Sequence, residues 1–192
     1  MALYSPTIEL KDEEISRLRS MQGFGPVPGK KRVAATICGF SINENRLTLD
    51  VGSKQGVKLG CPVECSEGLV GTIEEVESNQ CQVLMLTSVG LQPTSVGKTQ
   101  LVGGIDLSRN PHLLGTVRGE NASTLSMTFA DPKAPVQIGD LIVTSGLSDR
   151  IPSGLTIGKV IQTESNEEFG ILKARLSPSF EPGTLDVVFV LI

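Results

Sequence analysis

The feature that most constrains the fold is a change in hydrophobic period after residue 32. From Val33 onward the chain consists of short apolar runs, and the run 46–51 alternates cleanly between polar and apolar residues. Gly and Pro, with 21 and 11 residues, separate these runs. Short alternating runs with frequent turns are typical of β-sandwiches and β-barrels. The pattern therefore predicts an all-β fold, and the absence of a second long helical pattern argues against a parallel β/α sheet.

The periodicity predicts eleven strands. They are expected at 33–38, 46–51, 61–65, 69–76, 81–87, 113–117, 124–129, 141–144, 155–163, 171–176 and 186–192. We expect the stretch 106–111 to connect two halves of the structure.

A weak internal repeat predicts two similar modules. The string VKLGCPV at 57–63 resembles VQIGDLI at 136–142, and each is followed by a hairpin that resumes at a Gly-Leu pair. Each module must close or pack its sheet, because exposed strand edges invite pairing with other chains. Two closed β modules satisfy this requirement.

The first 22 residues follow a helical pattern. A Ser-Pro start, early acidic residues and late arginines match the capping and dipole preferences of a helix. Ile8, Ile15 and Leu18 fall on one seam of a heptad. We predict that this helix, 1–22, pairs with a second copy of the chain, although an amphipathic helix packed on its own domain fits the same pattern. A Gly/Pro-rich linker follows at 23–32.

The sequence contains no recognisable catalytic constellation. His112 is the only histidine, it follows a proline in a polar segment, and we expect it in a surface loop. The GxSxG elbow of the hydrolases and the Gly-rich phosphate loops are absent. The competing interpretation is a two-barrel serine- or cysteine-type hydrolase, with Ser145 or a cysteine as nucleophile and His112 as base.

The four cysteines, Cys38, Cys61, Cys65 and Cys81, match no metal-binding motif. Cys61 and Cys65 are too far apart on an extended strand to bridge each other. We expect small buried thiols, with a Cys38–Cys81 bridge or an intermolecular bond as the alternatives. No metal and no cofactor is expected.

Charge and aromatic content narrow the partners. The formal net charge is −4, with no basic stripe, which argues against nucleic acid. Aromatic residues make up only 4% of the chain, so the stacking platforms that glycan-binding modules use are nearly absent.

Two separated groups of motifs resemble the rod-shape-determining MreC family. The first is LTLDVGSKQGVKLGCPV at 47–63 with GLVGTI at 68–73. The second is IGDLIVTSGL at 138–147 with IPSGLTIGKV at 151–160. The resemblance runs from about residue 33 to residue 192. Its matched glycines are expected to serve tight turns or close backbone approaches. They are Gly52, Gly56, Gly60, Gly139, Gly146 and Gly158.

The resemblance implies two small β-barrels of chymotrypsin-like topology without catalytic residues. The first barrel is expected at 33–105 and the second at 106–183, and the family allows the last strand, 184–192, to complete the first barrel. The stretch between the barrels matches the family poorly.

The resemblance also implies a role as a non-catalytic, extracytoplasmic scaffold of the cell-elongation complex, periplasmic in a Gram-negative cell. An upstream membrane helix, which this sequence does not include, would anchor it. The implied partners are a second copy of the chain as a dimer or filament, a class B penicillin-binding transpeptidase, MreD and, indirectly, MreB.

Overall fold

The computed structural model describes residues 30–41, 44–89, 102–106, 110–147 and 150–192. The stretch Arg32–Ile192 is one compact unit. The predicted helix 1–22 lies outside the described residues, and with it Ile8, Ile15 and Leu18. Most of the predicted linker also lies outside them.

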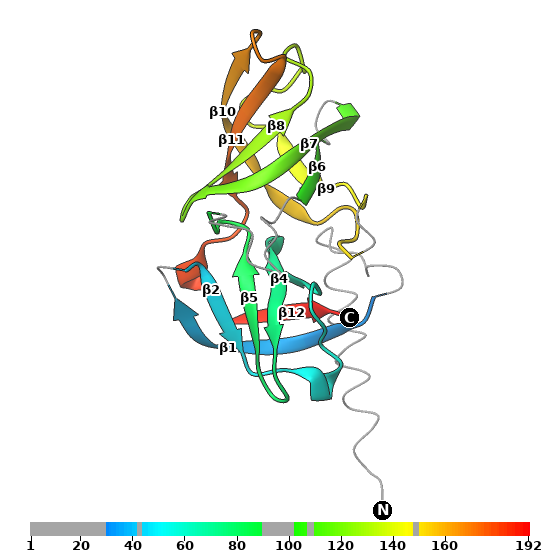
Figure 1. The fold of residues 1–192 in the computed structure, drawn as a ribbon, viewed down its shortest axis with the longest axis vertical. Coiled ribbons are helices and arrows are strands. Elements are labelled where there is room, and N and C mark those ends of the chain that lie inside the picture. Colours follow the sequence, from blue (N-terminus) through cyan, green and yellow to red (C-terminus); the bar gives the residue numbers. More distant parts are fainter. Residues whose placement is uncertain (1–29, 42–43, 90–101, 107–109, 148–149) are drawn as a thin grey trace, which may run out of the picture. The chain divides into compact units, whose positions relative to one another are not determined.

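The described chain forms two closed β-barrels of six strands each, and every strand pair is antiparallel (Figure 1). The first barrel has the strand order β1-β12-β3-β4-β5-β2. Its strands are β1 (Arg32–Ser41), β2 (Arg46–Leu49), β3 (Pro62–Glu64), β4 (Leu69–Val76), β5 (Cys81–Met85) and β12 (Val187–Leu191). Two short 3₁₀ turns, η1 (Ser53–Gln55) and η2 (Pro182–Thr184), lie between strands.

The second barrel has the strand order β10-β11-β8-β7-β6-β9. Its strands are β6 (Val102–Asp106), β7 (Asn110–Asn121), β8 (Thr124–Phe129), β9 (Leu141–Thr144), β10 (Thr156–Asn166) and β11 (Ile171–Pro178). Because both barrels are closed, each of these strands has a hydrogen-bonded neighbour on both sides, and the strand edges are protected from pairing with other chains.

Each barrel is filled by aliphatic side chains from alternate strand positions. In the first barrel, Leu47, Leu49, Val63 and Val83 are fully buried. In the second barrel, the burial of β8 alternates strictly, and Phe129 is its largest buried side chain. The alternation read from the sequence therefore corresponds to the inward and outward faces of the strands.

The last strand returns to the first barrel, as the resemblance allowed. Residues of β12 pair with β1 from Arg32↔Leu191 to Thr36↔Val187 and also with β3. Figure 1 shows this red strand beside the blue β1. The first barrel is thus completed by residues that follow the whole of the second barrel in the chain.

The expectation for the stretch 106–111 is wrong. Asp106 is the last residue of β6 and pairs with Asn110 of β7, so this stretch belongs to a hairpin of the second barrel and does not connect two modules. The strand β6 also belongs to the second barrel, although residues 102–105 were assigned to the first. Two adjacent glycines, Gly103 and Gly104, give this strand no alternating pattern, which is why its sequence predicted no strand.

Candidate interaction surface

Within the residues that the structure describes, no group of three or more His, Cys, Asp and Glu side chains could hold a metal ion. Nor does this part of the chain contain a helix long and apolar enough to cross a membrane.

The register of β6 separates the two residues that a hydrolase would need. Ser145 donates its backbone N–H to the carbonyl of Gly103, and Gly103 lies opposite Thr116 of β7. His112, on the same β7, lies in an irregular stretch between Leu114, which is opposite Ile105, and Asn110, which is opposite Asp106. Because β6 runs between β9 and β7, about two strand spacings of roughly 5 Å each separate the backbones of Ser145 and His112, and the two residues are also offset along the strands.

His112 differs from its expected setting, because it lies within β7 rather than in a loop. The Ser145 hydroxyl serves a turn, where it accepts a hydrogen bond from the backbone N–H of Leu147 at 3.3 Å.

All four cysteines are free thiols. Cys65 and Cys81 are buried, as expected, whereas Cys38 is exposed. Burial raises the pKa of the Cys65 thiol, and it raises the pKa of Cys81 to about 11. Cys38 and Cys81 lie on β1 and β5 with β2 between them, so their backbones are about 10 Å apart, too far for a disulfide.

An acidic groove lies where the β4–β5 hairpin closes one end of the first barrel. A cavity of about 620 Å³ is lined by Cys38, Asp50, Glu77, Ser78, Asn79 and Gln80. A neighbouring cavity of about 260 Å³ shares Glu77 and Gln80 with it. The carboxylates are held by hydrogen bonds, because Gln80 donates to Glu77 at 2.7 Å and Gln82 donates to Glu75 at 2.9 Å.

Exposed aliphatic side chains gather where the loop before β9 meets β10. Gly139 donates its backbone N–H to the carbonyl of Val160, and Val160 donates back to Asp140, which brings Ile138 beside Ile161. Ile138 is 70% exposed and Ile161 is 44% exposed. We call these two residues the Ile138–Ile161 patch. Ile161 follows the buried Val160 and lies at a register shift in β10, between Val160 and Gln162.

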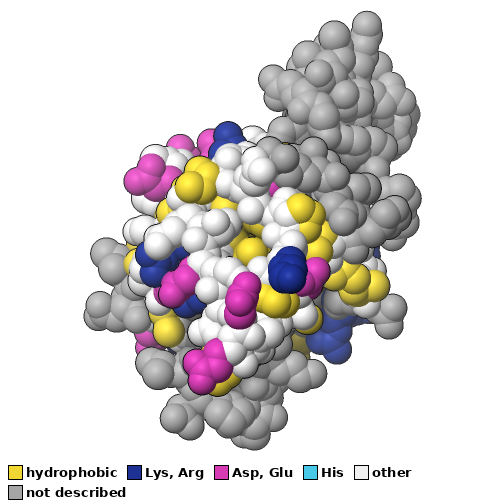
Figure 2. Space-filling view, turned by 90° about the horizontal axis from the view of Figure 1, so that it is seen from above, with side chains coloured by type: hydrophobic (Ala, Val, Ile, Leu, Met, Phe, Trp, Pro, Cys, Tyr) yellow, Lys and Arg dark blue, Asp and Glu magenta, His cyan; other side chains and the backbone are white. Residues whose placement is uncertain are grey.

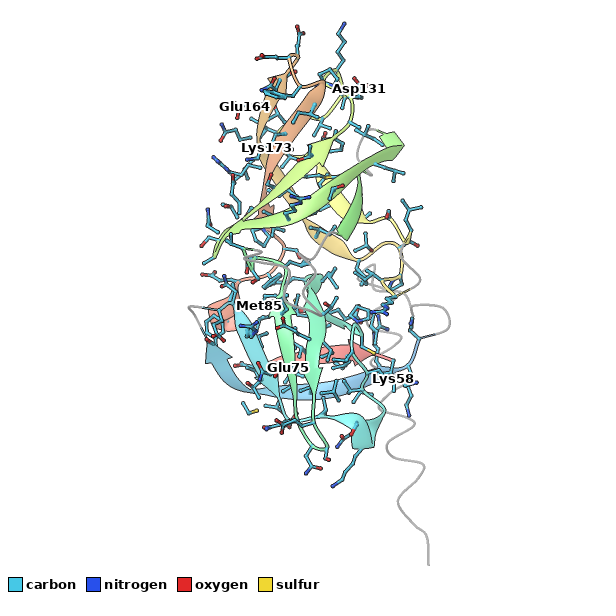
Figure 3. The ribbon with its side chains drawn as sticks, in the orientation of Figure 1. Lys58, Glu75, Met85, Asp131, Glu164 and Lys173 are labelled. Atoms are coloured by element: carbon cyan, nitrogen blue, oxygen red, sulfur yellow. The ribbon has the colours of Figure 1, made fainter. Side chains whose placement is uncertain are left out.

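A charged network borders this patch. Glu120 of β7 accepts hydrogen bonds from Arg175 at 2.7 Å and from Lys173 at 3.0 Å, and both donors lie on β11. These bonds hold the pKa of Glu120 down at about 2. Arg175 also donates to the side chain of Gln162, the residue after Ile161. Figure 3 shows Lys173 on β11 and Glu164 on the neighbouring β10. An apolar centre with a polar rim is the usual anatomy of a protein–protein contact.

Both barrels expose an aliphatic residue at the same repeat position. Ile138 corresponds to Leu59 of the first barrel, which is 54% exposed. Each stands directly before a glycine with positive φ, Gly139 or Gly60. The repeat itself is visible in the sequence, but the exposure of its aliphatic position is not. An aliphatic residue between a polar residue and a glycine can also be buried, as Ile157 is between Thr156 and Gly158.

The six glycines singled out from the sequence are spread over both barrels and form no common site. Positive φ values are found at Gly56, Gly60, Gly139 and Gly146. The other two allow close backbone approaches, since a Cβ at Gly52 would lie 2.4 Å from the carbonyl oxygen of Glu77. A Cβ at Gly158 would lie 2.2 Å from that of Ser177.

Comparison with known families shows which family matches this sequence. The family model described as "Rod shape-determining protein MreC, barrel core" matches residues 39–192. The chain belongs to the MreC family. Among curated MreC relatives, the cell shape-determining protein of Caulobacter vibrioides is 26% identical over 158 residues, which cover 81% of this chain and 42% of that protein. The Haemophilus influenzae protein is 28% identical over 148 residues, 76% of this chain and 39% of its own length. This chain therefore spans about two fifths of each.

Solved MreC structures share the fold. MreC from Pseudomonas aeruginosa has a TM-score of 0.74 at 24% identity and covers 84% of this chain and 99% of its own. A structure described as the major periplasmic domain of the cell shape-determining filament MreC has a TM-score of 0.69 at 20% identity, covering 84% and 95%. MreC from Helicobacter pylori, solved in a complex with the penicillin-binding protein PBP2, has a TM-score of 0.63 at 16% identity, covering 83% and 96%.

Proposed function

We propose that this chain is the extracytoplasmic, non-catalytic scaffold part of a cell-elongation complex. In this role it organises peptidoglycan synthesis by binding a class B penicillin-binding transpeptidase and by associating with further copies of itself. The observation that carries the proposal is membership of the MreC family over the whole two-barrel unit. The relatives named above are cell shape-determining proteins, one of them a filament and another a partner of PBP2.

The surface chemistry supports binding as the role of this unit. The described barrels offer exposed aliphatic side chains beside hydrogen-bonded charged groups. Figure 2 shows basic, acidic and hydrophobic side chains interspersed on one face of the molecule. Such mixed surfaces form specific interfaces once about 800 Å² is buried on each partner.

We assign the transpeptidase contact to the Ile138–Ile161 patch. Two exposed aliphatic residues on hydrogen-bonded neighbouring segments can be desolvated together, and the Glu120–Arg175 network can form the rim of the contact. The remaining partners of the proposed complex are MreD, in the membrane, and MreB filaments, which would be coupled indirectly. An upstream membrane helix would hold the chain at the membrane.

Calorimetry with the extracytoplasmic domain of the elongation transpeptidase from the same cell tests the proposal. We expect binding by this chain and by a version that starts at Lys30, because the patch lies on the second barrel. Ile138→Ser should weaken binding by about tenfold or more, as expected for an interface anchor.

Leu59→Ser is the matched control, because it removes an exposed aliphatic residue at the equivalent position of the first barrel. Equal losses in both variants would contradict the assignment to the second barrel. Loss of binding on removal of residues 1–29 would assign the contact to that segment, and no binding by either form would contradict the transpeptidase part of the proposal.

A further inference from the structure

The two barrels use the same arrangement of six strands but fill one position differently. Starting from β1 and β7, the neighbours match around both barrels, and β12 in the first barrel occupies the place of β6 in the second. The strand β6 precedes β7 directly and pairs with it as a local hairpin. The strand β12 comes from the far end of the chain, after the second barrel is complete.

The position that β12 fills is a slot between β1 and β3. The first half of β1, from Arg32 to Thr36, pairs with β12. The second half, from Ile37 onward, pairs with β2. On the other side, β12 pairs with β3 at Val190↔Val63 and Phe189↔Glu64.

The side chains of β12 alternate between exposed and buried positions over its first residues, as in a strand that binds in a groove. Val188 and Val190 point into the core and are fully buried, whereas Val187 is 51% exposed. Phe180 and Leu185, in the connection before β12, pack against the same core. The stretch 180–192 therefore acts as one apolar insert that completes the first barrel.

An ion pair spans this slot. Arg32 lies opposite Leu191 and Glu64 lies opposite Phe189, so the two charged residues flank β12 from its two neighbouring strands. The Arg32 guanidinium donates to the Glu64 carboxylate, whose side chain is 6% exposed. This contact joins β1 to β3 across β12 and secures a strand that no hairpin links to its neighbours.

We propose that the slot between β1 and β3 is a strand-binding site whose ligand is the C-terminal segment 180–192, supplied by the same chain or by a second copy. A strand that reaches its barrel from a segment remote in sequence makes the same contacts in either arrangement, which is the physical basis of domain swapping. Exchange between two copies links them through β12. This inference deepens the self-association part of the proposed function and rests on it only for its biological role.

Cross-strand cysteines test the exchange in the folded chain of residues 1–192. Thr36 and Val187 lie opposite each other, and both are exposed. The next pair, Ile37 and Asp186, is hydrogen-bonded through the Ile37 N–H and the Asp186 carbonyl. Thr36 and Val187 therefore form a non-hydrogen-bonded pair, in which the side chains are close together. All variants carry Cys38→Ser, which removes the exposed native thiol. A chain with Thr36→Cys is mixed with a chain with Val187→Cys, and disulfide-linked dimers are counted after oxidation. The variant that carries both substitutions should close an internal bond.

The second barrel provides a matched control. Thr116 and Thr128 lie opposite each other on β7 and β8, which are consecutive strands. Mixed Thr116→Cys and Thr128→Cys chains should form only the few dimers that random collision gives. We expect the Thr36→Cys and Val187→Cys mixture to exceed that level, and Glu64→Gln to increase its rate of cross-linking about tenfold through loss of a charge-assisted hydrogen bond.

The outcomes separate this inference from the proposed function. Cross-linking no greater than in the control mixture would overturn strand exchange. If sedimentation then still showed association of the copies, self-association would run through another surface and the proposed function would stand. Cross-linking above the control that Glu64→Gln leaves unchanged would refute the role of the ion pair.

Discussion

At the residue scale, the four thiols differ sharply in their surroundings. Cys38 is exposed and its thiol donates to the carbonyl of Thr48 at 3.4 Å, whereas Cys81 sits inside the same barrel with a pKa of about 11. Nucleophilic attack requires the thiolate, so a high pKa and burial both suppress the reactivity of Cys81.

We therefore predict that the thiols react in order of exposure, with the half-buried Cys61 slower than the exposed Cys38. With a chromogenic disulfide reagent at pH 8, Cys38 should react first, while Cys65 and Cys81 should react only when the barrel unfolds. Cys38→Ser should remove the fast phase and leave the slow phases unchanged. A fast phase that survives this substitution would contradict the assignment.

Glu120 gives a pH dependence with a defined direction. Its pKa is lowered from the usual 4.5 to about 2 by hydrogen bonds from Arg175 and Lys173. Its contribution to stability is therefore complete above about pH 4.5 and is lost as the pH falls toward 2.

Because the groups are partly exposed, we expect this contribution to be only about 1 kcal/mol. Urea unfolding of the wild type and of Glu120→Gln, at pH 7 and at pH 2, measures it. The difference between the two proteins should shrink at the lower pH. A constant difference would show that Glu120 does not titrate as described.

At the scale of the elements, glycines set how closely strands approach. Gly158 of β10 lies against the carbonyl of Ser177 in β11, and a Cβ there would come within 2.2 Å of its oxygen. Gly71 of β4 has the same relation to Leu84 of β5, at 2.1 Å. In both barrels, therefore, a glycine allows this equivalent pair of strands to approach closely.

Gly158→Ala should destabilise the protein by about 2–3 kcal/mol, because two strands must move apart to admit the methyl group. Gly183→Ala is the control, since a Cβ there meets nothing within 4 Å and its φ is not positive. That variant should lie within about 1 kcal/mol of the wild type. Chemical denaturation of both variants makes the comparison, and equal effects would argue against the close approach as the cause.

At the scale of the whole molecule, the two barrels depend differently on the chain. The strands of the second barrel are contiguous, from Val102 to Pro178, whereas the first barrel needs β12 from the C-terminus. Folding of the first barrel therefore involves contacts between residues that are far apart in sequence, and such contacts close slowly.

Deletion of residues 186–192 should unfold the first barrel and leave the second folded. The deletion removes three fully buried side chains, Val188, Val190 and Leu191, each worth about 1.5–3 kcal/mol, from a domain of marginal stability. A two-dimensional amide NMR spectrum should keep dispersed signals only for the second barrel. Val187→Ser, at an exposed position of β12, should leave both sets of signals intact. Dispersed signals from both barrels in the deletion variant would contradict the prediction.

Much of this architecture was predictable because the information is local. Each of the eleven expected strands has an observed counterpart, since alternation along a strand records which side chains face the core. The largest difference is β7, which spans Asn110–Asn121 where only 113–117 was expected. The glycines were also recognisable, because a turn or a close approach imposes its residue type on the position it needs. The strand β6 was missed for the opposite reason, as its glycines carry no hydrophobic alternation.

What the tertiary structure decided concerns partners that are distant in the chain. Only the closed barrel shows that β12 lies between β1 and β3, that Arg32 reaches Glu64 across it, and that Ile138 meets Ile161. Hydrophobic periodicity indicates whether a residue is buried or exposed, but it does not identify the residue's neighbours. Strand order and surface neighbours therefore cannot be predicted from it. The sequence alone therefore determined two β modules with an aliphatic core, and the fold determined which surfaces those modules present.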